Sequence, residues 1–347
     1  MRPVPAASAW KIPAIESVQA LADRLRLDFS ELQWFADLKG LAVKPDTKLA
    51  HYRYRTLAKQ PGSLRLIEAP KPRLKEMQRQ ILSQILDNIP IHSSAHGFVK
   101  GRSIQTFAAP HVGRRVVLRM DLQDFFPSIS GRRIQTFFRV AGYPEPVADL
   151  LGGICTNAAP HSIWKQLAPG VDRSLLQRMR DLYARPHLPQ GAPTSPALAN
   201  LCAYRMDCRL HGLAQAAGAE YTRYADDLAF SGGESFDQCV ERFAIHVASI
   251  VHQEGFAVHH RKTRIMRRGV RQYLAGLVTN ERLNIVRTDF DQLKAILYNC
   301  IRSGPESQNH EASPSFQMHL AGRIGFVESI NPGKGERLRK LFQHIQW

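Results

Sequence analysis

Two adjacent aspartates lie in the middle of the segment Ala219-Glu-Tyr-Thr-Arg-Tyr-Ala-Asp-Asp-Leu-Ala-Phe-Ser-Gly232. The residues on either side of the pair have the aromatic, β-branched and apolar composition of short strands. The segment therefore predicts a hairpin whose tip carries the carboxylates of Asp226 and Asp227. Neighbouring carboxylates raise each other's pKa, and a divalent cation such as Mg²⁺ is the usual compensation. An ordinary Asp-rich turn is the competing interpretation, which two residues alone would favour.

A second strand that ends in an aspartate favours the metal-binding interpretation over an ordinary turn. The apolar run Arg115-Val-Val-Leu-Arg-Met-Asp121 predicts a strand buried in a sheet, and it ends on Asp121. The chain between Asp121 and Asp226 leaves room for helical crossovers that bring the two strands side by side. The three aspartates would then hold two Mg²⁺ ions, with Mn²⁺ as a substitute, over one reacting phosphate. The first hypothesis is a two-metal nucleotidyl transferase.

The chain carries a large positive charge. Its 347 residues include 47 Lys plus Arg against 30 Asp plus Glu, a formal net charge of +17. Such a surplus favours a polyanionic partner, with nucleic acid as the first candidate and an anionic membrane as the competing one. The sequence contains no apolar run long enough to span a bilayer, no signal-peptide pattern and no cysteine spacing typical of zinc or disulfides. We therefore expect a cytoplasmic protein without a membrane partner.

Two segments offer contacts for an incoming nucleotide. The ring of Phe126 is predicted to lie under the sugar and to exclude a 2′-hydroxyl, with Phe125 as its core partner. The Gln190-Gly191 loop precedes a helix for which Ser195 is the predicted N-cap. Gln190 can donate to a nucleotide or template, and Gly191 lets the backbone approach a ligand closely.

Basic side chains are the next candidates. Residues 62–73 predict a pair of extended segments that turn at two prolines, from which Arg65 and Arg73 would close over a triphosphate. Ordinary surface charge explains these two arginines equally well. Lys262 is a candidate to protonate the departing pyrophosphate or, more simply, to contact a phosphate. Arg102 lies in a glycine-containing loop suited to a phosphate contact.

The two ends of the chain are predicted to be helical. Residues 1–60 form a helical N-terminal extension, to which no function is assigned. Three segments after residue 284 have helical spacing, and the last is amphipathic with a basic face. That face suits a nucleic-acid backbone, and a dimerisation surface is the alternative. The candidates for nucleic-acid binding are Arg102, Tyr224, Arg337, Arg339 and Lys340.

Taken in order, these motifs resemble the reverse transcriptases. The resemblance covers roughly residue 50 to the end and rests on Asp121-x-x-x-Phe-Phe126, Pro189-Gln-Gly191, Tyr224-Ala-Asp-Asp227 and the Lys262 segment. Within that family the chain is most similar to the bacterial retron enzymes. It departs from their pattern at Phe107, where they carry Asn, and at Leu274-Ala275, where they carry Val-Thr before Gly.

The resemblance implies an α+β right-hand polymerase fold, with fingers and palm over 61–283 and a helical thumb over 284–347. It implies that Asp121, Asp226 and Asp227 are the catalytic, metal-binding triad, with the Leu122 carbonyl as an extra metal ligand and Phe126 as the sugar gate. The expected enzyme uses dNTPs to copy a structured noncoding RNA, primed from a 2′-hydroxyl, into branched single-stranded DNA within an RNA–DNA hybrid. It would work with an effector protein in anti-phage defence.

Two alternatives stay open. One is another bacterial reverse transcriptase, such as a stand-alone defence enzyme, a group II intron relative or a template-independent polymerase. The other, from a different class, is a catalytically silent RNA-binding scaffold. The three retained carboxylates argue against the scaffold, because they cost free energy that only catalysis would justify.

Overall fold

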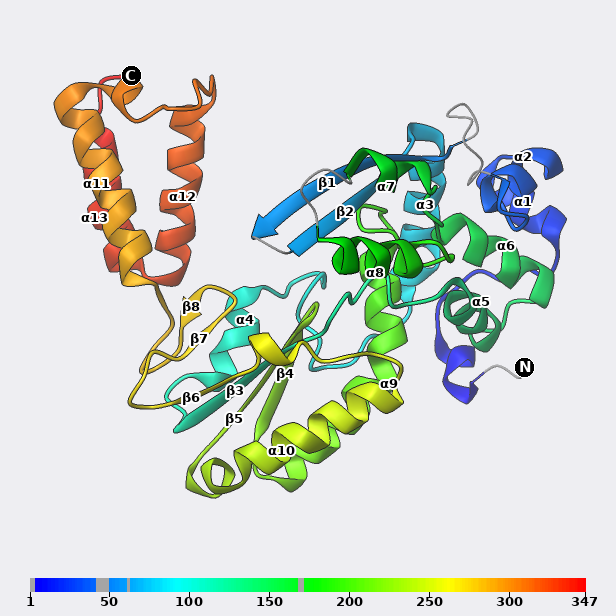
Figure 1. Ribbon diagram of the computed structural model, residues 1–347, viewed down its shortest axis with the longest axis horizontal. Coiled ribbons are helices and arrows are strands. Elements are labelled where there is room, and N and C mark those ends of the chain that lie inside the picture. Colours follow the sequence, from blue (N-terminus) through cyan, green and yellow to red (C-terminus); the bar gives the residue numbers. More distant parts are fainter. Residues whose placement is uncertain (1–3, 42–49, 61–62, 168–171) are drawn as a thin grey trace. The chain divides into compact units, whose positions relative to one another are not determined.

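The computed structural model describes residues 4–41, 50–60, 63–167 and 172–347 (Figure 1). The chain divides into two compact units, which are described in turn. The first comprises Met1–Phe98, Leu122–Leu210 and Ala248–Val258, and the second comprises Val99–Asp121, His211–Val247 and His259–Trp347. In the described part of the chain, no helix combines the length and the apolar character needed to cross a membrane.

The first unit contains a long antiparallel hairpin. It consists of β1 (Tyr52–Gln60) and β2 (Ser63–Pro70), with Leu57 opposite Arg65. This corrects two expectations. The N-terminal region is not helical throughout, because Tyr52–Gln60 is a strand. Pro70 and Pro72 do not join two extended segments: Pro70 is the last residue of β2, and Pro72 occupies the first turn of the helix that follows. Gly62 lies outside the described residues.

Most of the other elements of the first unit are helices. Helix α3 (Pro72–Gln84) turns an apolar stripe to the core, because Leu74, Met77 and Ile81 are buried. A core of Leu66, Ala159, Trp164, Leu176, Met179 and Tyr183 packs β2 against the segments that follow Cys155. The helices are α1 (Val18–Leu25), α2 (Phe29–Ala36), α3 (Pro72–Gln84), α5 (Gly131–Val140), α6 (Glu145–Cys155), α7 (Ser162–Leu167), α8 (Arg173–Tyr183) and most of α9 (Ser195–Ala216).

The predicted N-cap at Ser195 is wrong by one position. Helix α9 begins at Ser195 itself. The Ser195 hydroxyl donates to the Pro189 carbonyl at 2.7 Å. Leu198 N–H reaches the carbonyl of Thr194, one residue before the helix. The loop that carries Gln190 and Gly191 is therefore tied to the first residue of the helix.

The second unit is built on a four-stranded antiparallel sheet in the order β4-β5-β3-β6 (Figure 1). The strands are β3 (Val116–Asp121), β4 (Glu220–Tyr224), β5 (Asp227–Gly232) and β6 (Arg264–Arg267). Five of the six β3 side chains are buried, which explains its near-continuous apolar sequence. The first part of α10 (Glu234–Gln253) follows β5. Both sequence predictions, the buried strand ending at Asp121 and the hairpin around Asp226-Asp227, are confirmed.

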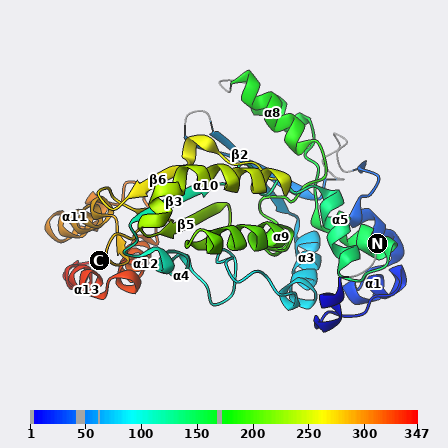
Figure 2. The ribbon, with the colours of Figure 1, turned by 90° about the horizontal axis from the view of Figure 1, so that it is seen from below.

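A small sheet and a helical bundle complete the second unit. The sheet has the order β7-β8-β9, formed by Tyr273–Leu274, Leu277–Val278 and Asn284–Ile285. With α4 (Ile104–Ala108) it covers a core that includes Phe107, Val117 and Leu277. The bundle consists of α11 (Arg287–Ser303), α12 (Phe316–Ile330) and α13 (Pro332–Gln343), which lie together in both ribbon views (Figures 1 and 2). Leu297, Leu320, Ile324 and Leu338 form its fully buried centre.

Candidate active site

Asp121 and Asp227 face each other across neighbouring strands. They are Cα partners at the end of the β3–β5 ladder, so their side chains emerge on the same face of the sheet. Asp226 is in the two-residue turn between β4 and β5, whose last paired residues are Tyr224 and Asp227. The three carboxylates that the sequence singled out are thus brought to one end of one sheet.

The turn itself is conformationally constrained. Ala225 has a φ of 55°, in the left-handed region that L-residues with a side chain occupy at a cost. The fully buried Arg223 donates to the Ala225 carbonyl at 3.1 Å. A guanidinium therefore supports, from within the protein, the turn that presents Asp226. Sequence reasoning did not assign Arg223 this role.

Two cations lie against the carboxylates. Lys262 Nζ is 2.9 Å from Asp121 Oδ1. Arg119 lies two positions before Asp121 on the same face of β3, and its guanidinium donates to both carboxylate oxygens of Asp227, at 2.7 and 3.1 Å. The sequence analysis named Lys262 and missed Arg119, although the period-2 spacing from Asp121 was a usable signal.

The electrostatics of the cluster are only partly balanced. Burial raises the pKa of Asp226, and the charges of Asp121 and Asp227 raise it further. Burial also raises the pKa of Asp227, and the hydrogen bonds and charge of Arg119 oppose that shift without cancelling it. Asp121 is 6% exposed. The cluster therefore has more negative charge than Lys262 and Arg119 together relieve.

This imbalance fits a divalent ion. Carboxylate oxygens are the hard donors that Mg²⁺ prefers, and an added cation would lower the free energy of the ionised cluster. Among the residues that the structure describes, no group of three His, Cys, Asp or Glu side chains is already arranged to hold an ion. Lys262 and Arg119 lie on the carboxylates instead. The donor set suits the ion, and binding requires these two cations to move aside or share their partners.

The nucleotide candidates Phe126 and Gln190 belong to the first unit. Phe125 is buried and packs on Phe256 with ring centroids 5.5 Å apart, as expected of a core residue. The half-buried ring of Phe126 makes edge contacts with Phe98 and Phe125, at 6.0 and 5.6 Å. Leu122 forms an isolated antiparallel bridge with Val258. The hydrogen bond beside it runs from Gln123 N–H to the Ala257 carbonyl, so it does not use the Leu122 carbonyl, the predicted extra metal ligand.

The Gln190-Gly191 loop is hydrogen-bonded to the β1–β2 hairpin. Glu68 N–H donates to the Gln190 carbonyl at 2.8 Å. Gly191 has a φ of 135°, and a Cβ there would lie 2.8 Å from the Glu68 carbonyl oxygen. Only glycine fits that approach. The half-buried Arg65 is on the same strand as Glu68, so β2 carries both the anchor of this loop and one predicted phosphate contact.

A buried polar network supports this loop, and sequence reasoning missed it. Glu68 accepts from Asn157 Nδ2 at 2.7 Å and lies 2.9 Å from His187 Nε2, with both Glu68 and His187 almost fully buried. His187 Nδ1 donates to the Arg185 carbonyl, because a carbonyl can only accept. Asn157 also donates to the Tyr54 hydroxyl on β1. The network joins the hairpin to the chain just before Gln190.

The remaining candidates are spread over both units. Arg73 is exposed in the first turn of α3 and donates to the Arg26 carbonyl at 3.3 Å, so it lies in a helix rather than a loop. In the second unit, half-buried Arg102 precedes α4, and the Tyr224 ring packs against Phe107. On α13, Arg339 pairs with Glu328 at 2.5 Å and Lys340 with Glu336 at 2.9 Å, while Arg337 is exposed.

A buried histidine also supports the aspartate hairpin. His111 is fully buried, and its ring nitrogens lie 2.7 Å from the hydroxyls of Ser231 and Thr222. These hydroxyls belong to β5 and β4. His111 therefore ties the two strands of the aspartate hairpin to the segment before β3.

Comparison with known proteins defines the class. Residues 57–278 match the family described as reverse transcriptase (RNA-dependent DNA polymerase). The match covers well over half of the chain, so the protein belongs to the reverse transcriptases. Its α+β architecture, with helices and antiparallel sheets, is accordingly the right-hand polymerase fold of that family.

Curated relatives narrow the family to the bacterial retron type. The chain is 40% identical over 86% of its length to the Retron Mx65 reverse transcriptase and 36% identical over 95% to the Retron Mx162 reverse transcriptase, both of Myxococcus xanthus. It spans about two thirds of those two proteins, 65% and 67% respectively. It is also 31% identical over 83% of its length to the Retron Ec86 reverse transcriptase of Escherichia coli, of which it covers 80%. The resemblance to retron reverse transcriptases drawn from the motifs is confirmed.

Proposed function

We propose that the protein is an RNA-directed DNA polymerase of the retron type, in which Asp121, Asp226 and Asp227 carry the metal ions. The observation that supports this most is the pairing of Asp121 with Asp227 across β3 and β5, with Asp226 in the adjoining turn. Two divalent ions bound there, Mg²⁺ or its substitute Mn²⁺, would activate the attacking oxygen and stabilise the leaving oxygen. The Leu122 carbonyl is proposed as an additional ligand.

The chain's own residues have distinct tasks in this proposal. Lys262 leaves Asp121 when an ion binds and is then available for the phosphates of the incoming dNTP. Arg119 stays on Asp227 and fixes the direction of its carboxylate. Gln190 and Gly191 contact the nucleotide, Arg65 and Arg73 contact its phosphates, and Phe126 excludes a 2′-hydroxyl.

We assign the parts of the fold as follows. Residues 61–283 form fingers and palm, 284–347 form the thumb, and 1–60 form an N-terminal extension. Arg102 and Tyr224, together with Arg337, Arg339 and Lys340 on α13, contact the template and the RNA–DNA hybrid. A nucleic-acid partner agrees with the formal charge of +17.

The substrate is proposed to be a structured noncoding RNA that serves as both template and primer. The product would be single-stranded DNA joined to that RNA through a 2′-hydroxyl, made in the cytoplasm and acting with an effector protein against phage. The names of the relatives support the retron assignment. Purifying the protein from cells that carry its surrounding genes and sequencing the bound nucleic acid tests it. A branched RNA–DNA species is expected, whereas RNA alone, or unbranched DNA, would contradict the retron assignment.

The alternatives remain distinguishable by the same preparation. A stand-alone or intron-related reverse transcriptase would extend an added primer but carry no branched product. A non-catalytic scaffold would bind RNA and incorporate no nucleotide. The unrelieved negative charge of the three aspartates speaks against the scaffold, because a protein without metal chemistry would be more stable with one of them neutral.

A further inference from the structure

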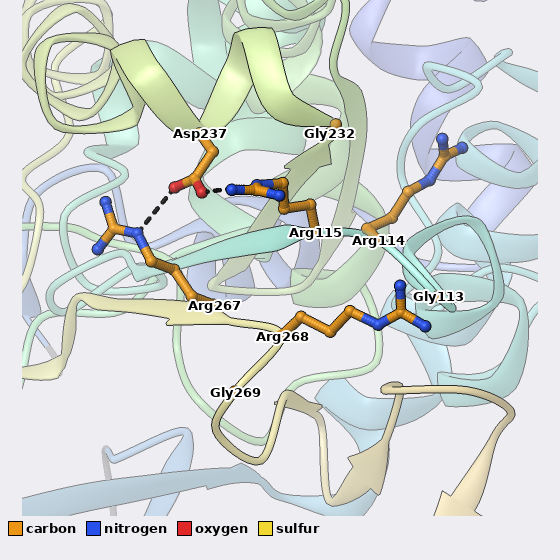
Figure 3. A pocket seen from close by; sticks show the side chains of 9 residues that line it. Gly113, Arg114, Arg115, Gly232, Asp237, Arg267, Arg268 and Gly269 are labelled. Carbon is orange, nitrogen blue, oxygen red and sulfur yellow. Dashed lines mark hydrogen bonds and ion pairs between the residues drawn. The ribbon is translucent and has the colours of Figure 1, made fainter.

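A basic hollow lies at the end of the four-stranded sheet opposite the aspartates. Its volume is about 510 Å³. Its lining includes Gly113, Gly232 and Gly269 together with four arginines: Arg114, Arg115, Arg267 and Arg268 (Figure 3). All of these residues belong to the second unit. The function proposed above uses none of them.

A single carboxylate organises two of the guanidinium groups. Asp237, in the first turns of α10, accepts from Arg115 Nε at 3.1 Å and from Arg267 Nε at 2.8 Å. Figure 3 shows the two arginines reaching Asp237 from opposite sides. The Asp237 side chain is only 14% exposed. It holds two like charges close together, and each guanidinium keeps N–H groups that do not point at Asp237.

The other acidic residues near the hollow form only exposed ion pairs with its arginines. Arg115 also meets Glu234 at 3.0 Å, Arg267 meets Glu241 at 2.8 Å, and Arg114 meets Glu220 at 3.3 Å. The side chains of these three glutamates are 67%, 61% and 53% exposed, and ion pairs so exposed contribute little.

Arg268 differs from the other three arginines of the hollow. Within the part of the chain that the structure describes, it makes no ion pair. Among the described residues, an arriving anion would therefore find Arg268 without an ion pair. It would also find exposed, readily replaced glutamate partners on Arg114, Arg115 and Arg267, while Asp237 keeps its contacts with the last two.

We propose that this hollow binds phosphate groups of the RNA at a point remote from the reacting end. A guanidinium group can bind two phosphate oxygens at once. Four guanidinium groups line the hollow, and only one carboxylate, that of Asp237, is largely buried among them. The proposal rests on the proposed function only in taking RNA as the polyanion. It adds a second contact surface, at the far end of the palm sheet.

The sheet fixes the spacing between the two sites. Arg115 immediately precedes β3 and Asp121 ends it, so six residue steps of strand separate them, or about 20 Å. Gln272 fixes the backbone at the hollow, since its side-chain amide donates to the carbonyls of Arg114, Arg115 and Met266. An RNA held at the hollow would be anchored while another part of it is copied.

The test uses the whole protein and a fluorescein-labelled RNA hairpin, with affinity measured by anisotropy between about 50 and 200 mM salt. The double variant Arg114→Gln/Arg268→Gln is chosen because neither residue supports Asp237. Losing two phosphate contacts should reduce the slope of log affinity against log salt by about two and weaken binding about tenfold. Arg114→Lys/Arg268→Lys, which keeps the charge, should retain most of the slope.

The matched control removes two arginines elsewhere, as Arg79→Gln/Arg132→Gln, and should leave the slope within experimental error of the wild type. An unchanged slope in the Arg114/Arg268 variant would overturn the proposal, and so would an equal loss in the control. Primer extension by the wild-type protein is run alongside. If the wild type extends and the variant binds normally, only the hollow is rejected. If the wild type does not extend but the variant loses RNA, the hollow stands and the polymerase proposal falls.

Discussion

Asp121 and Asp227 are direct partners in the β3–β5 ladder, and each is matched by a cation: Lys262 Nζ 2.9 Å from Asp121 and Arg119 Nη2 2.7 Å from Asp227. The two basic residues offset part of the charge that these carboxylates would otherwise share with Asp226. They also set a condition on metal binding, because an ion must compete with them. The relationship leads to predictions about activity and stability that point in opposite directions.

Replacing Asp226 by Asn should abolish nucleotide incorporation while leaving the fold intact or more stable. The variant removes a buried charge whose pKa is raised by burial and by Asp121 and Asp227. We expect incorporation to fall by at least about a thousandfold. In EDTA at neutral pH, the Tm should rise by about 2 °C. Thermal unfolding and a primer-extension assay on one preparation measure both, and a large fall in Tm would refute the electrostatic account of the cluster.

Replacing Phe126 by Ala should let the enzyme accept ribonucleotides, because the ring that excludes the 2′-hydroxyl is gone. Phe125→Ala is the matched comparison. Phe125 is buried, so its loss should cost about 3–5 kcal/mol of stability and leave sugar selectivity unchanged among molecules that remain folded. Competition between dNTP and rNTP incorporation measures the effect. Wild-type selectivity in Phe126→Ala would assign the exclusion to another residue.

Replacing Glu68 by Gln should raise the KM for dNTP several-fold with a smaller change in kcat. Asn157 donates to one carboxylate oxygen of Glu68, and His187 Nε2 lies 2.9 Å from the other. Gln has a single acceptor oxygen for these two neighbours and turns an NH2 group toward one of them. Disturbing this buried contact should cost about 1–3 kcal/mol of stability and loosen the Gln190 loop. Gln78 provides the control: it is buried against Tyr52 and Ile154, so Gln78→Leu should reduce stability without changing KM. Equal KM values for both variants would leave Glu68 a purely structural role.

The junction between α2 and β1 should weaken in mild acid. Burial lowers the pKa of His51 below its usual 6.5, and the bond to the Trp34 carbonyl opposes this only in part. The unfolded chain therefore binds this proton more readily than the folded one. Stability supplied by neutral His51 is complete above pH 6.5 and is lost as the pH falls below it. Tm measured from about pH 7.5 to 5.5 should fall more in the wild type than in His51→Gln, and parallel curves would argue against it.

The two arginines of α13 should differ in their effect on nucleic-acid binding, because their contacts differ. Arg337 is exposed, so Arg337→Gln should reduce the salt dependence of hybrid binding by about one unit of slope. Arg339 already pairs with Glu328 of α12, so Arg339→Gln should change the slope less. Anisotropy with a labelled RNA–DNA hybrid gives both slopes. If Arg339→Gln has the larger effect, the ion pair must open when nucleic acid binds.

Much of the palm could be predicted from local pattern. The apolar run before Asp121 and the strand composition around Asp226-Asp227 each specify an element whose side chains must be buried on known faces. The β1 strand was missed because residues 1–60 were expected to be helical, although Tyr52 and Tyr54 at period two are typical of a strand with one covered face.

Residues that act through distant partners were harder to find. Glu68, Asn157 and His187 meet only after the hairpin and the segment before Gln190 have packed together. No spacing in the sequence marks such a network, because its members come from three separate segments. The arginine hollow is similar: Arg115 and Arg267 are distant in sequence and converge on Asp237 only through the pairing of β3 with β6.

The most direct test of the central claim is extension of a DNA primer on an RNA template with dNTPs and Mg²⁺. The wild-type protein should produce complementary DNA, and both Asp121→Asn and Asp227→Asn should produce none while keeping the wild-type Tm or a higher one. DNA synthesis undiminished in either folded variant, or no synthesis by the wild type in the presence of Mg²⁺ or Mn²⁺, would contradict the account.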